Sequence, residues 1–237
     1  MKQSLKLILL VLSSFAVAGF LQAGPPTAAD VGDAETFGHA ALYMGAVSGF
    51  QTLEPTGGCP APSSDSSCDE LAPGLTNFSH ENICRINLPK KATRNVIYPA
   101  INIFLNYQLQ NSAATDQQGL LRFTAGITIV SDALNGPDCT DPSTSAPCGG
   151  KMTLLFNYNY RDDRNMHPND RQRLQETLVR VGNTGLTRQQ FHDSFGLTNA
   201  SVDALFAGPM TVQLDINGSA RNLTNASITC NMRLFGD

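Results

Sequence analysis

Residues 101–110 have the sequence INIFLNYQLQ, in which an apolar residue occupies every second position. Such alternation is typical of a strand that buries one face and exposes the other. Three further segments alternate in the same way, namely residues 121–129, 154–160 and 210–216. Their Gly, Pro and Asn-rich connections favour antiparallel pairing. We expect a mainly β protein, built as an antiparallel β-sandwich or open barrel held by disulfides and carrying a small helical insert.

A turn is expected directly after residues 210–216. Asn217 and Gly218 are the residue types that most readily adopt the positive φ angles of a type I′ hairpin. We therefore expect a hairpin at this point, and a final strand around residues 228–234 that pairs with a neighbour through this hairpin or the next turn.

Residues 1–23 have the features of a secretory signal peptide. Two lysines precede an apolar run over residues 7–20, and small residues end the segment at Ala23. The run is shorter than the roughly 20 apolar residues of a membrane-spanning helix, and no later run is long enough to span a bilayer. We expect export, followed by one β-rich domain over residues 24–237 that is secreted, periplasmic or displayed at the cell surface.

The six cysteines all follow the predicted cleavage site, and an even number in an exported chain indicates disulfides. Two pairs have the same spacing and enclose loops rich in proline and serine, so each should close a connection between antiparallel strands. The other two cysteines alternate with apolar residues and should meet in the core. The predicted disulfides are Cys59–Cys68, Cys139–Cys148 and Cys84–Cys230. A zinc site would need closely spaced Cys or His pairs, which the sequence lacks.

One segment departs from the strand pattern. Over residues 168–181 the apolar residues are spaced three and four apart, which predicts an amphipathic helix. Thr187 begins a capping box, and Thr198 or Asn199 can cap a further helix that Gly208 and Pro209 end. We therefore expect a helical insert at about residues 167–208.

The composition excludes several classes of protein. The formal net charge is -4, so no basic surface for nucleic acid is indicated. Charged residues make up 15% of the chain, below the roughly one quarter of an average soluble domain, which argues against a charged coiled coil. Hydrophobic residues make up 41%, enough to form a core.

Candidate catalytic residues are few. Ser48 follows Gly45-Ala-Val, but the segment lacks the glycine spacing of a nucleophile elbow. His167 and His192 fall in the predicted insert near carboxylates, and neither belongs to a recognisable catalytic motif. A secreted hydrolase that uses one of these histidines with a carboxylate is an alternative to a protein without catalytic activity.

The carboxylates Asp30, Asp33 and Glu35 form a candidate calcium site. They surround a glycine-containing turn, and calcium favours carboxylate and carbonyl oxygens. No EF-hand pattern is present, and no other cofactor is indicated. A calcium-dependent adhesion module is therefore a second alternative.

The function that we favour from the sequence is an exported structural or binding protein without catalytic activity. Residues 101–110 and 152–160 predict flat strands with few of the lysines that protect sheet edges, so the protein could self-associate through its edges. The small-residue stretch over residues 40–49 could add to a neighbour's sheet in the same way. Other copies of the chain, or components of the cell surface, are the expected partners.

Overall fold

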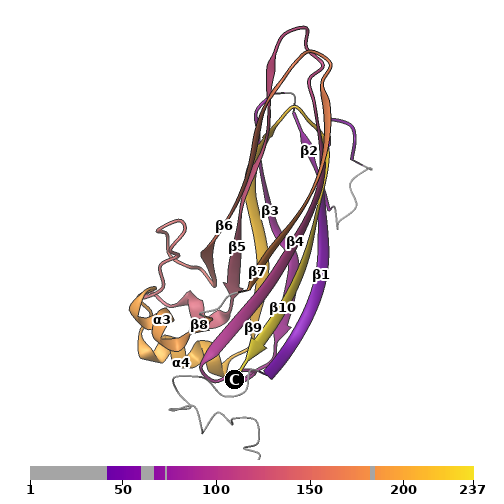
Figure 1. The fold of residues 1–237 in the computed structure, drawn as a ribbon. Coiled ribbons are helices and arrows are strands. Elements are labelled where there is room, and N and C mark those ends of the chain that lie inside the picture. The colour runs from indigo at the N-terminus through magenta and orange to yellow at the C-terminus, as the bar shows by residue number, and fades with distance from the viewer. Residues whose placement is uncertain (1–41, 60–66, 73, 182–184) are drawn as a thin grey trace, which may run out of the picture. The chain divides into compact units, whose positions relative to one another are not determined.

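The computed structural model describes residues 42–59, 67–72, 74–181 and 185–237, which belong to a compact unit that spans Leu42–Asp237. The predicted signal peptide and the candidate calcium ligands Asp30, Asp33 and Glu35 lie outside the described residues. Within the unit, two β-sheets face each other and a small group of helices lies at one end (Figure 1).

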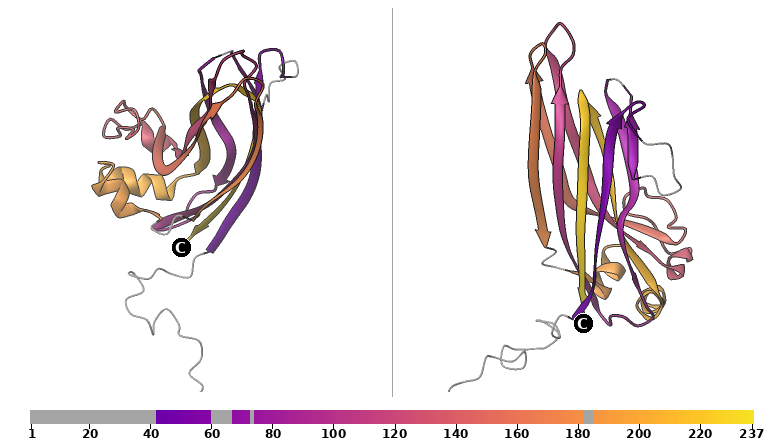
Figure 2. Two further views of the ribbon diagram at one scale, coloured as in Figure 1. Left: turned by 45° about the horizontal axis from the view of Figure 1, so that its top comes forward. Right: turned by 90° about the vertical axis from the view of Figure 1, so that its right-hand side faces the viewer.

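The first sheet, here called sheet A, has the strand order β2-β1-β10-β4-β7, and the short strand β8 pairs with the start of β4. Its long strands lie side by side in the right-hand view of Figure 2. The strands are β1 (Leu42–Pro55), β2 (Cys68–Leu71), β4 (Val96–Gln110), β7 (Arg171–Val181), β8 (Leu186–Thr187) and β10 (Leu223–Gly236).

The second sheet, sheet B, has the order β3-β9-β5-β6, and every pair in it is antiparallel. Its strands are β3 (Thr76–Leu88), β5 (Gln117–Val130), β6 (Lys151–Met166) and β9 (Met210–Arg221). Apolar side chains from both sheets fill the space between them and form one buried cluster. The prediction of a mainly β, sandwich-like fold with disulfides is confirmed.

Strand β4 shows how the sequence pattern produces this core. The apolar residues at its odd-numbered positions are all at most 3% exposed, and they are Ile101, Ile103, Leu105, Tyr107 and Leu109. On the opposite face, Asn102 and Asn106 are partly or fully exposed. The period-two pattern therefore predicts both the strand and its buried face.

The helical part of the chain is shorter than predicted. It consists of α3 (Arg188–Asp193) and α4 (Asn199–Ala207), which lie near the 3₁₀ helix η3 (Asp132–Asn135). Thr187 and Thr198 cap α3 and α4 as predicted, since each side-chain oxygen accepts a backbone N–H of the first turn. Gly208 ends α4, also as predicted.

The predicted helix over residues 168–181 is wrong, because Arg171–Val181 forms strand β7. Leu174 and Leu178 pair with Tyr107 and Ile103 of β4. Residues four apart lie on one face of a helix, but they also lie on one face of a strand. The local spacing was therefore compatible with both structures, and the strand β4 that it pairs with is distant in sequence.

The predicted hairpin at Asn217 and Gly218 is also wrong. Strand β9 continues through both residues to Arg221, and the chain turns at Asn222, whose φ is 53°. After this turn the chain leaves sheet B, so β10 pairs with β1 and β4 instead of β9. Gly218 is required here for a different reason: a Cβ atom at this position would lie 2.3 Å from the carbonyl oxygen of Arg122.

The six cysteines form three disulfides, and the pairs are Cys59–Cys68, Cys84–Cys230 and Cys139–Cys148, the same pairs that the spacing predicts. Cys84–Cys230 joins sheet B to sheet A, because Cys84 lies in β3 and Cys230 in β10. The loop closed by Cys139–Cys148 connects the antiparallel neighbours β5 and β6. The loop closed by Cys59–Cys68 differs from the prediction, since β1 and β2 are parallel.

We predict that Gly218→Ala lowers the free energy of unfolding by about 1–3 kcal/mol, because the added methyl group overlaps the backbone of β5. Asn222→Gly is the matched change at the actual turn and should be tolerated, since glycine adopts positive φ readily. Urea unfolding followed by circular dichroism measures both variants. A stable Gly218→Ala variant together with a destabilised Asn222→Gly variant would contradict the observed position of the turn.

The side chain of Asp237 connects the end of β10 to the segment that leads into β4. Its carboxylate accepts hydrogen bonds from the Thr93 hydroxyl, at 2.8 Å, and from the backbone N–H groups of Asn95 and Val96, at 2.8 and 3.2 Å. Burial alone would raise the pKa of Asp237, but these hydrogen bonds outweigh that effect and lower the pKa to about 2.

A group whose pKa is lowered by folding stabilises the protein above its unfolded pKa, here near 3.8, and loses that contribution as the pH falls toward 2. We therefore expect Asp237→Asn to be less stable than the parent at pH 7 and nearly equal to it at about pH 2. Urea unfolding at several pH values tests this, with Asp203→Asn as the control, because the Asp203 side chain is 73% exposed. A difference between Asp237→Asn and the parent that does not vary with pH would refute the role of this carboxylate.

Candidate functional site

The two histidines of the hydrolase alternative do not form a catalytic arrangement within the described residues. His167 lies in the connection from β6 to β7, outside the helices, and its side chain is 75% exposed. Its Nδ1 atom is 3.0 Å from Asp116, whose carboxylate raises the pKa of His167. His192, in α3, contacts the neighbouring Asp193 at 2.6 Å and is also exposed. In this part of the chain neither imidazole has a hydrogen bond to a serine or cysteine.

Carboxylates in the described ranges serve structural roles. Asp162 is 2.8 Å from Arg164 and Asp163 is 2.9 Å from Arg161. Asp141 is buried and accepts hydrogen bonds from Ser143 and from the backbone of residues 144 and 153. No group of three potential metal ligands occurs among the residues that the structure describes. The calcium site at Asp30, Asp33 and Glu35 stays a prediction.

A pair of tyrosines, of which Tyr107 is buried and Tyr160 partly buried, connects the two sheets. The hydroxyl of Tyr107 in β4 is 2.6 Å from that of Tyr160 in β6 and donates to Asp162 at 2.6 Å. Burial and these two partners raise the pKa of Tyr107, which keeps its hydroxyl protonated. Arg164 contacts the same carboxylate. Every hydroxyl in this cluster has a partner, so it acts as a link between the sheets.

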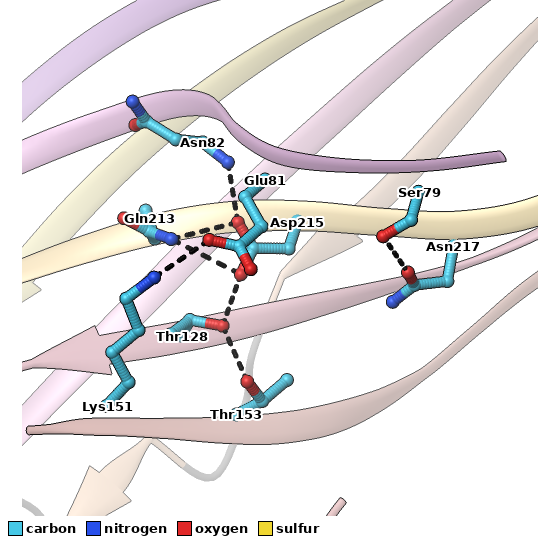
Figure 3. Close-up of polar contacts among 9 residues, drawn as sticks. All are labelled: Ser79, Glu81, Asn82, Thr128, Lys151, Thr153, Gln213, Asp215 and Asn217. Carbon is cyan, nitrogen blue, oxygen red and sulfur yellow. Dashed lines mark hydrogen bonds and ion pairs between the residues drawn. The ribbon is translucent and has the colours of Figure 1, made fainter. Parts of the chain in front are cut away.

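A polar network occupies the outer face of sheet B, and Figure 3 shows its members. At its centre is Asp215 of β9, which is only 7% exposed. Its carboxylate accepts hydrogen bonds from the Thr128 hydroxyl, the Gln213 amide and the backbone N–H of Asn82. Thr128 also contacts Thr153 at 3.0 Å. The network contains no nucleophile paired with a base. Its structural effect is to fix the position of β3, through the hydrogen bond from Asn82 to Asp215.

The segment held by Asp215 is a bulge in β3. His80 and Cys84 pair with adjacent residues on either side of Asp215, so residues 81–83 together lie opposite it. Asn82 adopts a positive φ of 64° in the bulge and donates its N–H to Asp215 at 2.6 Å. The bulge also brings the carbonyl of Ile83 against β1 at Gly49, where a Cβ atom would lie 1.8 Å from that oxygen. The polar network on sheet B therefore fixes the contact between β3 and β1.

A cavity of about 400 Å³ adjoins this network at the end of sheet B next to η3. Its lining includes Ser131, Asn135, Lys151 and Thr211. The ammonium group of Lys151 is 2.8 Å from Glu81, and this contact raises the pKa of Lys151. The only cationic side chain of the lining is thus already paired, and the rest of the lining provides the carboxylate of Asp132 and neutral hydrogen-bonding groups.

We predict that Asp215→Ala lowers the free energy of unfolding by about 1–3 kcal/mol, because the N–H of Asn82 and the hydroxyl of Thr128 lose their acceptor. Asn217→Ala is the matched control, since Asn217 is exposed on the same face of β9 and contacts Ser79. Urea unfolding should separate the two variants clearly. Equal effects would argue against a special role for Asp215.

Three of the long sheet edges belong to strands that carry charged residues. Strands β3, β6 and β7 each have one long edge without a neighbouring strand among the described residues. All three carry charged residues, and β3 and β6 also contain irregularities in pairing. Charges and bulges at edges are the usual means by which β-proteins prevent pairing with other chains.

The edge of β1 is uncharged over residues 43–51, and its one pairing irregularity lies at its start, between Tyr43 and Gly45. Strand β2 pairs with β1 only from Thr52 to Pro55, so residues 43–51 have no strand partner on that side in the described part of the chain. This segment has the sequence YMGAVSGFQ and contains neither a charged residue nor a proline. Two of its aromatic side chains are exposed, Tyr43 at 63% and Phe50 at 56%. It is the candidate interaction site of this protein.

The sequence identified this site in part. Residues 40–49 were expected to be available for pairing, and those among them that the structure describes do lie on the open edge of β1. Residues 152–160 lie in the edge strand β6. Residues 101–110 were wrongly expected at an edge, because β4 pairs with β10 on one side and with β7 on the other.

Comparisons with known proteins assign no family. No family model matches the chain, and no curated protein matches it either. Among solved structures, it is similar to infectious bursal disease virus, Gx strain (7% identity, TM-score 0.25), and to the VP2 subviral particle of the same virus (8%, TM-score 0.22). The matches cover 83% of this chain but only 31% and 32% of those chains. At such scores the likeness supports no inference about function.

Two general features bear on where the protein acts. The three disulfides fit a protein that folds outside the reducing cytosol. Among the described residues, no helix combines the length and the apolar character needed to cross a bilayer.

Proposed function

We propose that this protein is an exported structural or binding protein without catalytic activity, which self-associates through an open sheet edge. The observation that carries the proposal is the edge of β1 over residues 43–51, which is long, uncharged and without a strand partner in the described ranges. Unpaired N–H and C=O groups on such an edge form hydrogen bonds readily with another strand.

Export is supported by the disulfides and by the predicted signal peptide at residues 1–23. Two of the disulfides join cysteines nine residues apart, and the third joins the two sheets. Such bonds form and persist in the periplasm, at the cell surface or in the extracellular medium. There they would stabilise the sandwich after export.

The chemistry of the described residues also favours a role in binding over one in catalysis. The histidines of the hydrolase alternative are exposed, and neither lines the cavity next to η3. The most buried carboxylates, Asp141 and Asp215, are occupied by hydrogen bonds within the fold. What the surface offers instead is neutral hydrogen-bonding groups and exposed aromatic rings.

Ala46 and Ala100 provide a matched test. Both lie on the outer face of sheet A, on either side of Arg233, but Ala46 is on the open edge strand and Ala100 is on the internal strand β4. We expect the parent protein to associate with increasing concentration, Ala46→Lys to shift the apparent dissociation constant at least tenfold toward monomer, and Ala100→Lys to behave like the parent. Size-exclusion chromatography with light scattering over a concentration series measures this.

Both lysines add the same charge next to Arg233, so an effect on the face of the sheet would appear in both variants. Weakening by Ala100→Lys to the same extent would assign the association to the face. A strictly monomeric parent protein at high concentration would remove the proposal.

A further inference from the structure

The backbone of β1 presents a regular row of hydrogen-bonding groups on its open edge. The N–H of Thr52 points to this side, because it donates to the carbonyl of Ser67 at 2.6 Å just before β2 begins. Residues two apart in a strand point their N–H and C=O groups to the same side. The groups of Phe50, Ser48 and Ala46 therefore face the open edge, while the residues between them bond to β10.

The lack of charge on the edge of β1 restricts which strands can pair with it. A strand that pairs with residues 43–51 is brought within about 5 Å of an uncharged surface, so its own charged groups would lose water without gaining a counter-charge. The edges of β3 and β7 carry such charges. The edge of β6 is uncharged from Met152 to Tyr160, but its pairing is irregular between Leu154 and Tyr158, which breaks the row of edge groups. Within the described part of the chain, the long edge that is uncharged and, from Gly45 on, regular is that of β1 itself, in a second copy.

We propose that two copies of the chain pair β1 with β1 in antiparallel orientation, about a two-fold axis that passes next to Ser48. This inference rests on the proposed function and specifies its interface. Ser48 lies opposite Ser48 of the second copy, and Ala46 lies opposite Phe50 of the second copy. Each of these pairs exchanges both of its N–H···O hydrogen bonds, so every edge-facing group from Ala46 to Phe50 gains a partner.

The side chains fit this register on both faces. On the outer face, the 56% exposed ring of Phe50 lies over the small side chain of Ala46 of the second copy. Arg233 lies beside that alanine in its own chain, so its guanidinium is within reach of the same ring. On the inner face, Val47 lies opposite Gly49 of the second copy, whose side-chain position is taken by the Ile83 carbonyl of its own chain, so Val47 meets backbone there instead of a second side chain.

The pairing is limited in length and closed. Strand β2 occupies the same edge from Thr52 onward, so a second copy cannot extend its contact past that residue. A two-fold interface uses the same patch on both subunits, and the product is a dimer with no free β1 edge. The two copies of sheet A then form one continuous sheet.

Cysteine cross-linking tests the register. Two cysteines at position 48 would be directly opposite each other, within the Cα separation that a disulfide needs. Two cysteines at position 46 would be offset by four residues, or about 13 Å along the strand, which is too far to bridge. Ala46→Cys is a suitable control because it is exposed on the same edge as Ser48→Cys.

We expect mild oxidation of Ser48→Cys to give a covalent dimer in most of the protein, Ala46→Cys to give at least tenfold less, and the double variant Ala46→Cys/Phe50→Cys to restore dimer formation. Non-reducing electrophoresis and mass spectrometry of the linked peptides provide the readout. An associating parent whose Ser48→Cys variant does not cross-link would overturn this interface while leaving self-association intact. A monomeric parent that cross-links in no variant would overturn both proposals, and would point to occupation of the edge by residues before β1.

Discussion

The attachment of β3 to the strands β1 and β10 is the constraint on which the rest of the structure depends. At one point of β3, Cys84 is bonded to Cys230 of the opposite sheet, and the preceding bulge places Ile83 against Gly49. The bulge keeps this shape because Asp215 accepts the N–H of Asn82. A buried carboxylate on one sheet thus determines where an edge strand of the other sheet lies. Because β3 contacts β1 on its inner face, the open edge of β1 is left free.

Much of the fold could be predicted from local sequence. In β4, strict alternation identified the buried face, because the polarity of each residue indicates which side of the strand it lies on. The two equally spaced cysteine pairs and the two core-facing cysteines gave the disulfides for similar reasons, and the threonine caps of α3 and α4 were equally local.

The errors share a physical cause, which is that long-range pairing decided between two locally acceptable structures. Arg171–Val181 had a spacing that fits a helix, but β4 offered it a free edge and it became a strand. Asn217 and Gly218 had the residues of a tight turn, but Gly218 was needed where β9 passes close to β5. In each case the local sequence pattern was recognised correctly, but the structure predicted from it was wrong.

The candidate interaction site could also be predicted only in part from local sequence. The uncharged, small-residue segment that begins before β1 was visible in the sequence, but which strand lies at an edge depends on the order of strands in the sheet. That order placed residues 101–110 inside sheet A. Asp215 was missed entirely, because a single aspartate on the polar face of an alternating strand gives no sign that it will be buried. The only available signal for a polar network at this point was the pair of polar residues Gln213 and Asn217, two positions away on the same face.

The parallel pairing of β2 with β1 has a consequence for the redox behaviour of the protein. Strand β2 is only four residues long, and the disulfide Cys59–Cys68 ties its first residue to the end of β1. A strand this short contributes few hydrogen bonds of its own, so its position depends strongly on that bond. In a reducing environment β2 would lose this covalent tie and would be held to β1 by its hydrogen bonds and by the buried side chain of Leu71. Oxidation of the Cys59–Cys68 pair therefore helps to keep the open edge of β1 confined to residues 43–51.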